Sequence, residues 1–357
     1  MLRRVLALLT LFSGIYGYAA NYPEPKEGDF IVRSFQFKSG EQLPQIKIHY
    51  RTLGTLQRDK NGRSSNAVLI LHGTGGSGSQ FLTENFAGVL FGPGQLLDAS
   101  RYFIILPDNI GHGGSSKPSD GLRMRFPHYE YADMIKLQYL LLTQGLGVDH
   151  LRLVMGTSMG GMHTWLWAED HPDFMDAAMP LASLPVEIGG RNRILRKMIV
   201  DSIRGDPQWR AGEYKAEPVQ GLSAALSILF IMSSSPLQQQ KQAPTRDAAD
   251  ALFDSWKATR LKTTDANDML YYFDASRNYN PAPQLDAIKV PLTAINSADD
   301  LINPPELGIA QRAIARVKNG KFVLLPITEQ THGHGTHSYP ALWQEHLAEL
   351  LKRSQAR

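Results

Sequence analysis

The sequence predicts an α/β fold built on a mostly parallel sheet. Short, continuous apolar runs such as 67–71 (AVLIL) and 102–106 (YFIIL) are typical of strands that are buried on both faces of a sheet. Helical stretches separate most of these runs, and this alternation indicates the crossover connections of parallel strands. With 357 residues, of which 43% are hydrophobic, the chain can also bury a large core.

Eight segments have the composition of strands. The first two are separated by a turn at residues 39–41. The fifth is followed by a serine between glycines, Ser158, and then by a helical stretch that runs to about His171. The predicted strands are residues 30–37, 45–51, 67–71, 102–106, 151–155, 177–181, 292–295 and 322–325.

The strand pattern stops between residues 186 and 285. Three stretches in this region have helical patterns, and polar turns such as 233–236 (SSSP) join them. We interpret the region as a helical lid that is inserted into the sheet domain and covers the end of the sheet. The sheet domain then comprises residues 21–185 and 286–357. The predicted lid helices are residues 191–204, 222–233 and 247–261.

Residues 1–20 (MLRRVLALLTLFSGIYGYAA) have the pattern of a secretory signal peptide. Two arginines precede about a dozen apolar residues, and small residues precede Asn21. The apolar part is shorter than the ~20 residues that a bilayer span needs. An uncleaved anchor and a hydrophobic first helix are the alternatives. We therefore expect a periplasmic or secreted mature protein without a membrane span.

The composition excludes several kinds of site. Without cysteine, the chain has no disulfide, thiolate metal site, iron–sulfur cluster or cysteine nucleophile. The 37 basic and 34 acidic residues give a net charge of +3, too small to point to nucleic acid. Residues 73–78 (GTGGSG) match a dinucleotide-binding pattern, with Asp98 at a suitable distance. However, 91–94 (FGPG) follows too soon for the helix of such a site, so no cofactor is expected.

The GTSMG sequence of residues 156–160 is the motif that indicates the chemistry of the protein. In an α/β-hydrolase, the nucleophilic serine of a GxSxG motif lies on a sharp turn between a strand and a helix. The motif here follows an apolar strand and precedes a helical stretch. It therefore predicts an α/β-hydrolase fold, with an eight-stranded sheet and the helical lid, and Ser158 as the nucleophile.

A serine hydroxyl needs a base to take its proton and a carboxylate to orient that base. In this fold the chain order is serine, acid, histidine, and the strands at 292–295 and 322–325 are followed by suitable residues. Asp299 and Asp300 are the candidate acids; we favour Asp300 because a proline follows it by four residues. His334 and His337 are the candidate bases; we favour His334, which follows a glycine.

Acyl chemistry also requires an oxyanion hole, two N–H groups that stabilise charge on the attacked carbonyl oxygen. We expect the backbone N–H groups of Met159, directly after the nucleophile, and Thr74, in the loop after the third strand. The three histidines of residues 332–337 could instead bind a metal, since close imidazoles bind zinc. No fourth ligand is suggested nearby, so we expect no metal.

Further motifs extend the similarity beyond the catalytic residues. The chain resembles the homoserine O-acetyltransferase branch of the α/β-hydrolase superfamily across residues 28–350. The resemblance implies a helical lid, a dimer formed through lid helices, and a ping-pong mechanism in which Ser158 is acylated before an acceptor takes the acyl group. The motifs include residues 92–94 (GPG), 158–162 (SMGGM), 206–209 (DPQW) and 265–267 (DAN).

The departures from that branch guide the predicted function. By the resemblance, an arginine, a tyrosine and an aspartate that hold homoserine fall at Leu226, Ser233 and Gly335. A buried amino acid loses its polar partners without them, and acetyl-CoA is a cytosolic donor. We therefore predict an exported serine hydrolase that acts on a small-molecule carboxylic ester. The alternatives are an acyltransferase that uses acetyl-CoA and a non-catalytic binding protein.

Overall fold

The computed structural model describes residues 21–355. The predicted signal peptide, residues 1–20, lies outside the described residues. Among the described helices, none is by itself long and apolar enough to cross a membrane; α5 (Val219–Ser233) and α6 (Pro236–Gln242) pass such a test only as a pair bent by 105°.

The predicted eight-stranded, mostly parallel sheet is confirmed. Its strand order is β1-β2-β4-β3-β5-β6-β7-β8; β1 and β2 are antiparallel to each other, β2 is antiparallel to β4, and the other neighbours are parallel. The strands are β1 (Lys26–Gln36), β2 (Gln42–Leu53), β3 (Ala67–Leu71), β4 (Phe103–Pro107), β5 (Leu153–Thr157), β6 (Ala178–Leu181), β7 (Leu292–Ser297) and β8 (Gly320–Leu325).

The first two strands are longer than the sequence predicts. β1 begins at Lys26 rather than at residue 30, and the register pairs Lys26 with Thr52 of β2. The added residues are mostly polar and exposed, because β1 is the edge strand of the sheet. An apolar pattern therefore cannot mark their start, whereas β3 to β7 are buried along their whole length and were predicted to within two residues.

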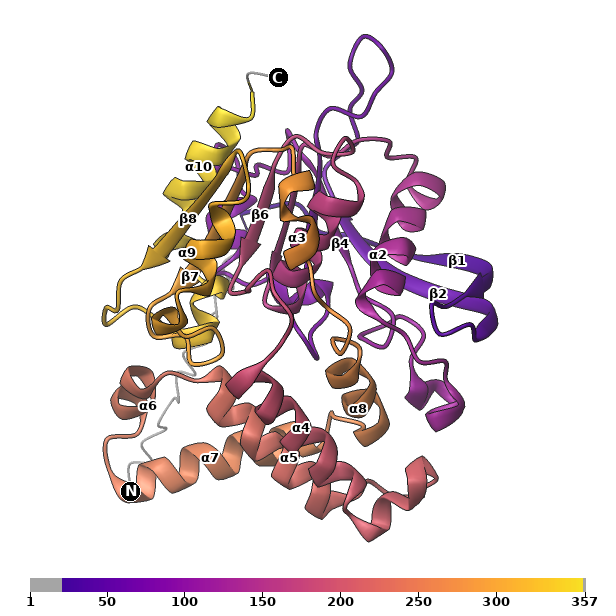
Figure 1. Ribbon diagram of the computed structural model, residues 1–357, viewed down its shortest axis with the longest axis vertical. Helices are drawn as coiled ribbons and strands as arrows, with labels where there is room; N and C mark the ends of the chain where they lie inside the picture. The colour runs from indigo at the N-terminus through magenta and orange to yellow at the C-terminus, as the bar shows by residue number, and fades with distance from the viewer. Residues whose placement is uncertain (1–20, 356–357) are drawn as a thin grey trace, which may run out of the picture.

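Helices cover both faces of the sheet, and each face has its own apolar cluster (Figure 1). On one face Trp165 and Trp167 of α3 are buried against strands β3 and β5. On the other, Phe86 and Trp343 lie together with 6.0 Å between their ring centres. The helices that cover the two faces are α1 (Ala87–Leu90), α2 (Tyr131–Leu140), α3 (Met159–Asp170), α9 (Ile309–Ile314) and α10 (Gln344–Arg353).

A second layer of helices lies beyond the carboxyl ends of the parallel strands (Figure 1). These helices share an apolar cluster of their own, in which Ile203, Leu222 and Phe273 are buried. We call α4 to α8 the lid layer. Its helices are α4 (Gly190–Arg204), α5, α6, α7 (Arg246–Leu261) and α8 (Ala266–Asp274).

The sequence analysis missed two lid helices, α6 and α8. In α8 every residue from Ala266 to Phe273 is buried, including the polar Asn267 and Asp268, so burial does not divide the helix into a core face and a solvent face. Its start is marked instead by Asp265, whose side chain accepts a hydrogen bond from the backbone N–H of Asp268 at 2.9 Å.

Candidate active site

Ser158 lies in the sharp turn between β5 and α3. Its φ of 56° and ψ of −112° are strained for a residue with a side chain. The surrounding glycines make this turn possible: a Cβ at Gly156 would lie 2.2 Å from the carbonyl oxygen of Gly160, and one at Gly160 would lie 1.9 Å from that of Leu71. The turn holds the half-buried Ser158 side chain at the carboxyl end of the sheet.

His334 lies between Ser158 and Asp300 and is hydrogen-bonded to both. Its Nε2 is 2.8 Å from Oγ of Ser158, and its Nδ1 is 2.8 Å from Oδ2 of Asp300. An ionised carboxylate only accepts hydrogen bonds, so Nδ1 carries the proton in a neutral ring. Nε2 is then free to accept the hydroxyl proton of Ser158, which is the arrangement that general-base catalysis requires.

The Asp300 carboxylate is fully buried yet remains ionised. Burial alone would raise its pKa, but His334, the side-chain amide of Asn303 and the backbone N–H of Ile302 together lower the pKa below its ordinary value. The amide of Asn303 lies 2.9 Å from Oδ2, and the N–H of Ile302 lies 2.8 Å from Oδ1. These contacts hold the carboxylate in place within hydrogen-bonding distance of His334.

The competing candidates occupy other positions. Oδ2 of Asp299 accepts the backbone N–H of Gly333 at 2.8 Å, so this carboxylate ties the acid loop to the histidine loop. His337 lies edge-on against His334, with 5.4 Å between the ring centres, and its Nδ1 is 3.0 Å from the hydroxyl of Ser338. Burial, and then the neighbouring His334, lower the pKa of His337 to about 3, so its ring is neutral.

The loop after β3 passes directly beside the serine. A Cβ at Gly73 would lie 3.5 Å from the Cβ of Ser158, which places the adjacent Thr74 next to the nucleophile. Met159, the other expected donor, is the first residue of α3 and is buried. The backbone N–H groups at the start of a helix have no partner within it, so the N–H of Met159 is free for a ligand.

His72, which the sequence analysis did not select, braces this loop. The ring is fully buried, and burial lowers its pKa to about 4. Nδ1 donates to the carbonyl oxygen of Gly73 at 2.8 Å, while Nε2 accepts the backbone N–H of Asn109 at 2.9 Å. His72 therefore links the loop after β3 to the loop after β4. Its position, immediately before the glycine-rich loop, is a signal that could have found it.

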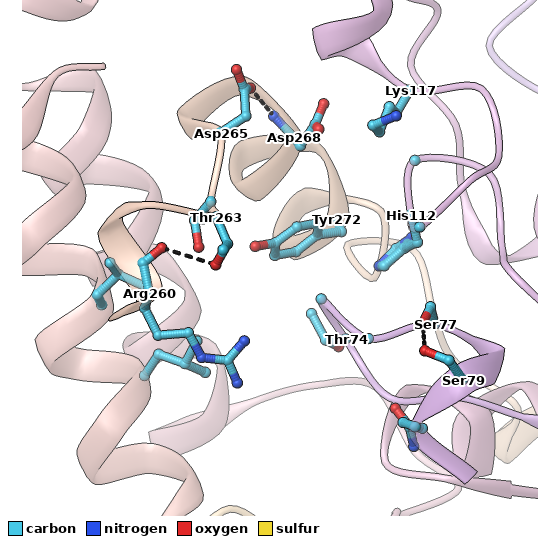
Figure 2. A pocket seen from close by; sticks show the side chains of 18 residues that line it. Thr74, Ser77, Ser79, His112, Lys117, Arg260, Thr263, Asp265, Asp268 and Tyr272 are labelled. Atoms are coloured by element: carbon cyan, nitrogen blue, oxygen red, sulfur yellow. Dashed lines mark hydrogen bonds between the residues drawn. The ribbon is translucent and has the colours of Figure 1, made fainter. Parts of the chain in front are cut away.

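A cavity of about 590 Å³ lies between this loop and the lid layer (Figure 2). Thr74 and His112 lie on one side, and Arg260, Thr263 and Tyr272 on the other. Arg260 points its guanidinium into the space between them, as Figure 2 shows. The cavity can therefore hold a small polar molecule next to the loop that carries Thr74. Within residues 21–355, no group of three or more His, Asp or Glu side chains could hold a metal ion.

The fold and this hydrogen-bonded site define the class of protein. A family model described as "alpha/beta hydrolase fold" matches residues 66–326. A homoserine O-acetyltransferase from Pelobacter propionicus is 32% identical to the chain, with 90% of this chain and 94% of the relative covered. The chain belongs to the α/β-hydrolase family and, within it, to the homoserine O-acetyltransferase-like branch.

Solved structures show the same fold. A homoserine O-acetyltransferase from Bacillus anthracis matches with a TM-score of 0.79 at 21% identity and covers 92% of this chain and 97% of its own. An acetylester hydrolase from Corynebacterium glutamicum matches with a TM-score of 0.79 at 21% identity, covering 92% and 96%. Together with the curated relative, these findings show that the chain is an enzyme of the hydrolase and acyltransferase type.

Proposed function

We propose that the protein is a serine-dependent O-acyltransferase that moves an acyl group from a thioester donor, such as acetyl-CoA, to the hydroxyl group of a small acceptor. The hydrogen-bonded chain of Ser158, His334 and Asp300 carries the proposal, because it supplies the nucleophile and its base. The curated relative is named a homoserine O-acetyltransferase over nearly its whole length, which supports transfer over the hydrolysis that the sequence alone favoured.

The first half-reaction acylates the enzyme. Oγ of Ser158 attacks the thioester carbonyl carbon while Nε2 of His334 takes the hydroxyl proton. The negative charge that develops on the carbonyl oxygen is stabilised by the backbone N–H groups of Thr74 and Met159. The C–S bond then breaks, and the thiolate leaves with the proton that His334 returns. Asp300 stabilises the imidazolium that forms between these steps.

The second half-reaction uses the same residues in reverse order. The acceptor hydroxyl gives its proton to Nε2 of His334 as its oxygen attacks the acyl carbon on Ser158. Collapse of this intermediate forms the ester product and breaks the bond to Oγ of Ser158, which recovers its proton from His334. The cavity beside Thr74 supports the proposal because it offers space for an acceptor next to the loop that carries this expected oxyanion donor.

Hydrolysis is the second candidate, and Leu226 favours it. Leu226 is buried in α5 and lines the cavity at the position where the resemblance places an arginine. Leu226 itself gives no charge partner to the carboxylate of an amino-acid acceptor, and the guanidinium that points into this cavity is instead that of Arg260. Water needs no such partner, so it can accept the acyl group with the same catalytic residues.

Steady-state assays distinguish the candidates. Purified protein is incubated with acetyl-CoA, with and without homoserine, and separately with p-nitrophenyl acetate. Release of CoA that depends on homoserine supports transfer, whereas CoA release or ester cleavage that homoserine does not change supports hydrolysis. The Ser158→Ala variant is the control in both assays. Failure of a fluorophosphonate probe to label the wild-type protein would contradict both candidates and leave a non-catalytic binding role.

We further propose that the mature protein is exported, on the pattern of residues 1–20. Mass spectrometry of the protein from fractionated cells tests this, with a mature chain that starts at residue 20 or 21 as the expected result. An exported enzyme is separated from cytosolic acetyl-CoA, so that result would favour hydrolysis or another donor. Recovery of the intact Met1 end in the cytosol would favour acetyl-CoA.

A further inference from the structure

The loop after β3 packs against the nucleophile. A Cβ at Gly73 would lie 3.5 Å from the Cβ of Ser158. The sheet domain holds this loop through His72, whose Nδ1 donates to the carbonyl oxygen of Gly73 at 2.8 Å. The next residue, Thr74, carries an expected oxyanion donor, its backbone N–H. A shift of the loop would therefore move this donor relative to the carbonyl group that Ser158 attacks.

Tyr272 contacts the same loop from the lid layer. A Cβ at Gly75 would lie 3.4 Å from Cζ and 3.6 Å from Cε2 of Tyr272, so ring carbons make this contact. The ring of His112 lies 5.1 Å from that of Tyr272 and 5.0 Å from that of His72, measured between ring centres. Figure 2 shows the Tyr272 and His112 rings side by side, next to the loop that carries Thr74. The three rings therefore form a continuous contact from the lid to the loop.

Hydrogen bonds to the sheet domain fix the position of Tyr272. This residue lies one turn after Asp268 in α8, on the same face of the helix. The Asp268 carboxylate accepts the backbone N–H of Ser119 at 2.9 Å and the hydroxyl of Ser119 at 2.7 Å. Ser119 belongs to the segment after β4, which also carries His112. Because Tyr272 is only 9% exposed, its ring has little room to turn away from the loop.

We propose that Tyr272 is a positioning residue for the oxyanion hole: its ring holds the loop of residues 73–75 against Ser158, so that the backbone N–H of Thr74 keeps its place. The inference rests on the proposed function, in which Ser158 is the nucleophile. The loop is then supported from two sides, by His72 in the sheet domain and by Tyr272 in the lid layer. Loss of the Tyr272 ring removes the support from the lid and leaves the nucleophile and its base in place.

Replacement of the Tyr272 ring tests this role. With p-nitrophenyl acetate, we expect Tyr272→Leu to lower kcat about tenfold to 100-fold with KM changed by less than about threefold, because the transition state loses a well-placed donor while the substrate still binds. Tyr272→Phe keeps the ring carbons that contact Gly75 and should restore kcat to within about threefold of wild type. A Tyr272→Leu enzyme within twofold of wild type in kcat would overturn the proposal, and so would a loss of more than about tenfold in Tyr272→Phe.

Tyr271→Leu is the matched control. Tyr271 is the neighbouring residue in α8, is 5% exposed, and packs against Phe126 of the sheet domain with 6.0 Å between the ring centres. Both substitutions remove a buried phenol ring from the same helix, so both should lower the melting temperature. Tyr271→Leu should keep kcat within about threefold of wild type. An equal loss of kcat in the two variants would mean that Tyr272 acts only through the stability of the lid, which would overturn the proposal.

Inhibition by phenylboronic acid gives a second measurement, because its tetrahedral adduct with Ser158 resembles the transition state of acyl transfer. We expect weaker inhibition of Tyr272→Leu, by about the factor lost in kcat/KM, and unchanged inhibition of Tyr271→Leu. If Tyr272→Leu is insoluble, Tyr272→Met replaces it in each comparison, since methionine adapts readily to a core. Unchanged inhibition of the folded variant would overturn the proposal. Failure of the proposed function itself has a different signature, since the wild-type protein would neither cleave p-nitrophenyl acetate nor react with a fluorophosphonate.

Discussion

Nδ1 of His334 lies 2.8 Å from Oδ2 of Asp300, and both side chains are buried. The contact joins the loop after β7 to the loop after β8, and it holds the ring in the tautomer that can take a proton from Ser158. Asp299, one residue earlier, faces the backbone of Gly333 instead. The two adjacent carboxylates thus have different structural roles, which substitution can separate.

Asp300→Asn is expected to lower kcat by about 10³-fold to 10⁴-fold, because the amide favours the wrong tautomer of His334. Asp299→Asn keeps an oxygen that can accept from Gly333 and should cost less than about tenfold. Kinetics with p-nitrophenyl acetate or acetyl-CoA provide the measurement. A greater loss in Asp299→Asn than in Asp300→Asn would show that the acid had been assigned to the wrong residue.

His334→Ala is expected to abolish turnover and leave the fold intact, since it removes the only ring that is hydrogen-bonded to Ser158 among the described residues. His337→Gln should retain turnover. Its kcat should fall only as far as the missing ring, which packs against His334, disturbs the position of His334. Circular dichroism checks folding, and kcat on the same substrate checks activity. Activity in His334→Ala together with inactivity in His337→Gln would reverse the assignment.

The turn between β5 and α3 at Ser158 could be predicted from the sequence because backbone constraints specify it. Glycines at 156 and 160 are required by contacts shorter than 2.5 Å that any Cβ would make, and such constraints are visible as a motif. The choice between Asp299 and Asp300 was weaker. Both follow β7 directly, and only the course of the loop determines which carboxylate faces His334.

The remaining features depend on contacts between distant segments. Ser119 and Asp268 come from the segment after β4 and from α8, and nothing in their local sequence indicates that the Ser119 hydroxyl donates to Asp268 at 2.7 Å. The same holds for α8, in which the polar Asn267 and Asp268 are buried beside apolar residues through contacts that the local sequence does not show. The eight-stranded sheet was predictable, whereas the polar contacts that join it to the lid layer were not.

Glu169 is expected to make stability depend on pH. Burial, and then Asp170, raise its pKa from the ordinary value of 4.5 to about 8, and its Oε1 is buried without a hydrogen-bond partner. Between these two values the folded protein binds more protons than the unfolded chain, so the free energy of unfolding falls as pH rises, by at most about 1.4 kcal/mol per pH unit from this group.

Urea unfolding of wild type and Glu169→Gln at pH 5 and pH 8 measures this effect. The wild-type protein should lose more stability than the variant between the two values. Glu306→Gln, at an exposed side chain, is the control and should keep the wild-type slope. Equal slopes in wild type and Glu169→Gln would show that Glu169 is not held protonated by its surroundings.

Gly160→Ala is expected to prevent correct folding of the serine turn. The added Cβ would lie 1.9 Å from the carbonyl oxygen of Leu71, in the strand that carries the Thr74 loop, and backbone on that side cannot move without displacing the sheet. We expect insoluble protein, or a soluble variant with less than about 1% of wild-type turnover and a lower melting temperature. Gly189→Ala adds the same methyl group where nothing lies within 4 Å, and it should match wild type in expression, melting temperature and kcat. A soluble Gly160→Ala enzyme with wild-type kcat would contradict this prediction. It would show that β3 and the serine turn lie farther apart in solution than the distance between Gly160 and Leu71 in the structure.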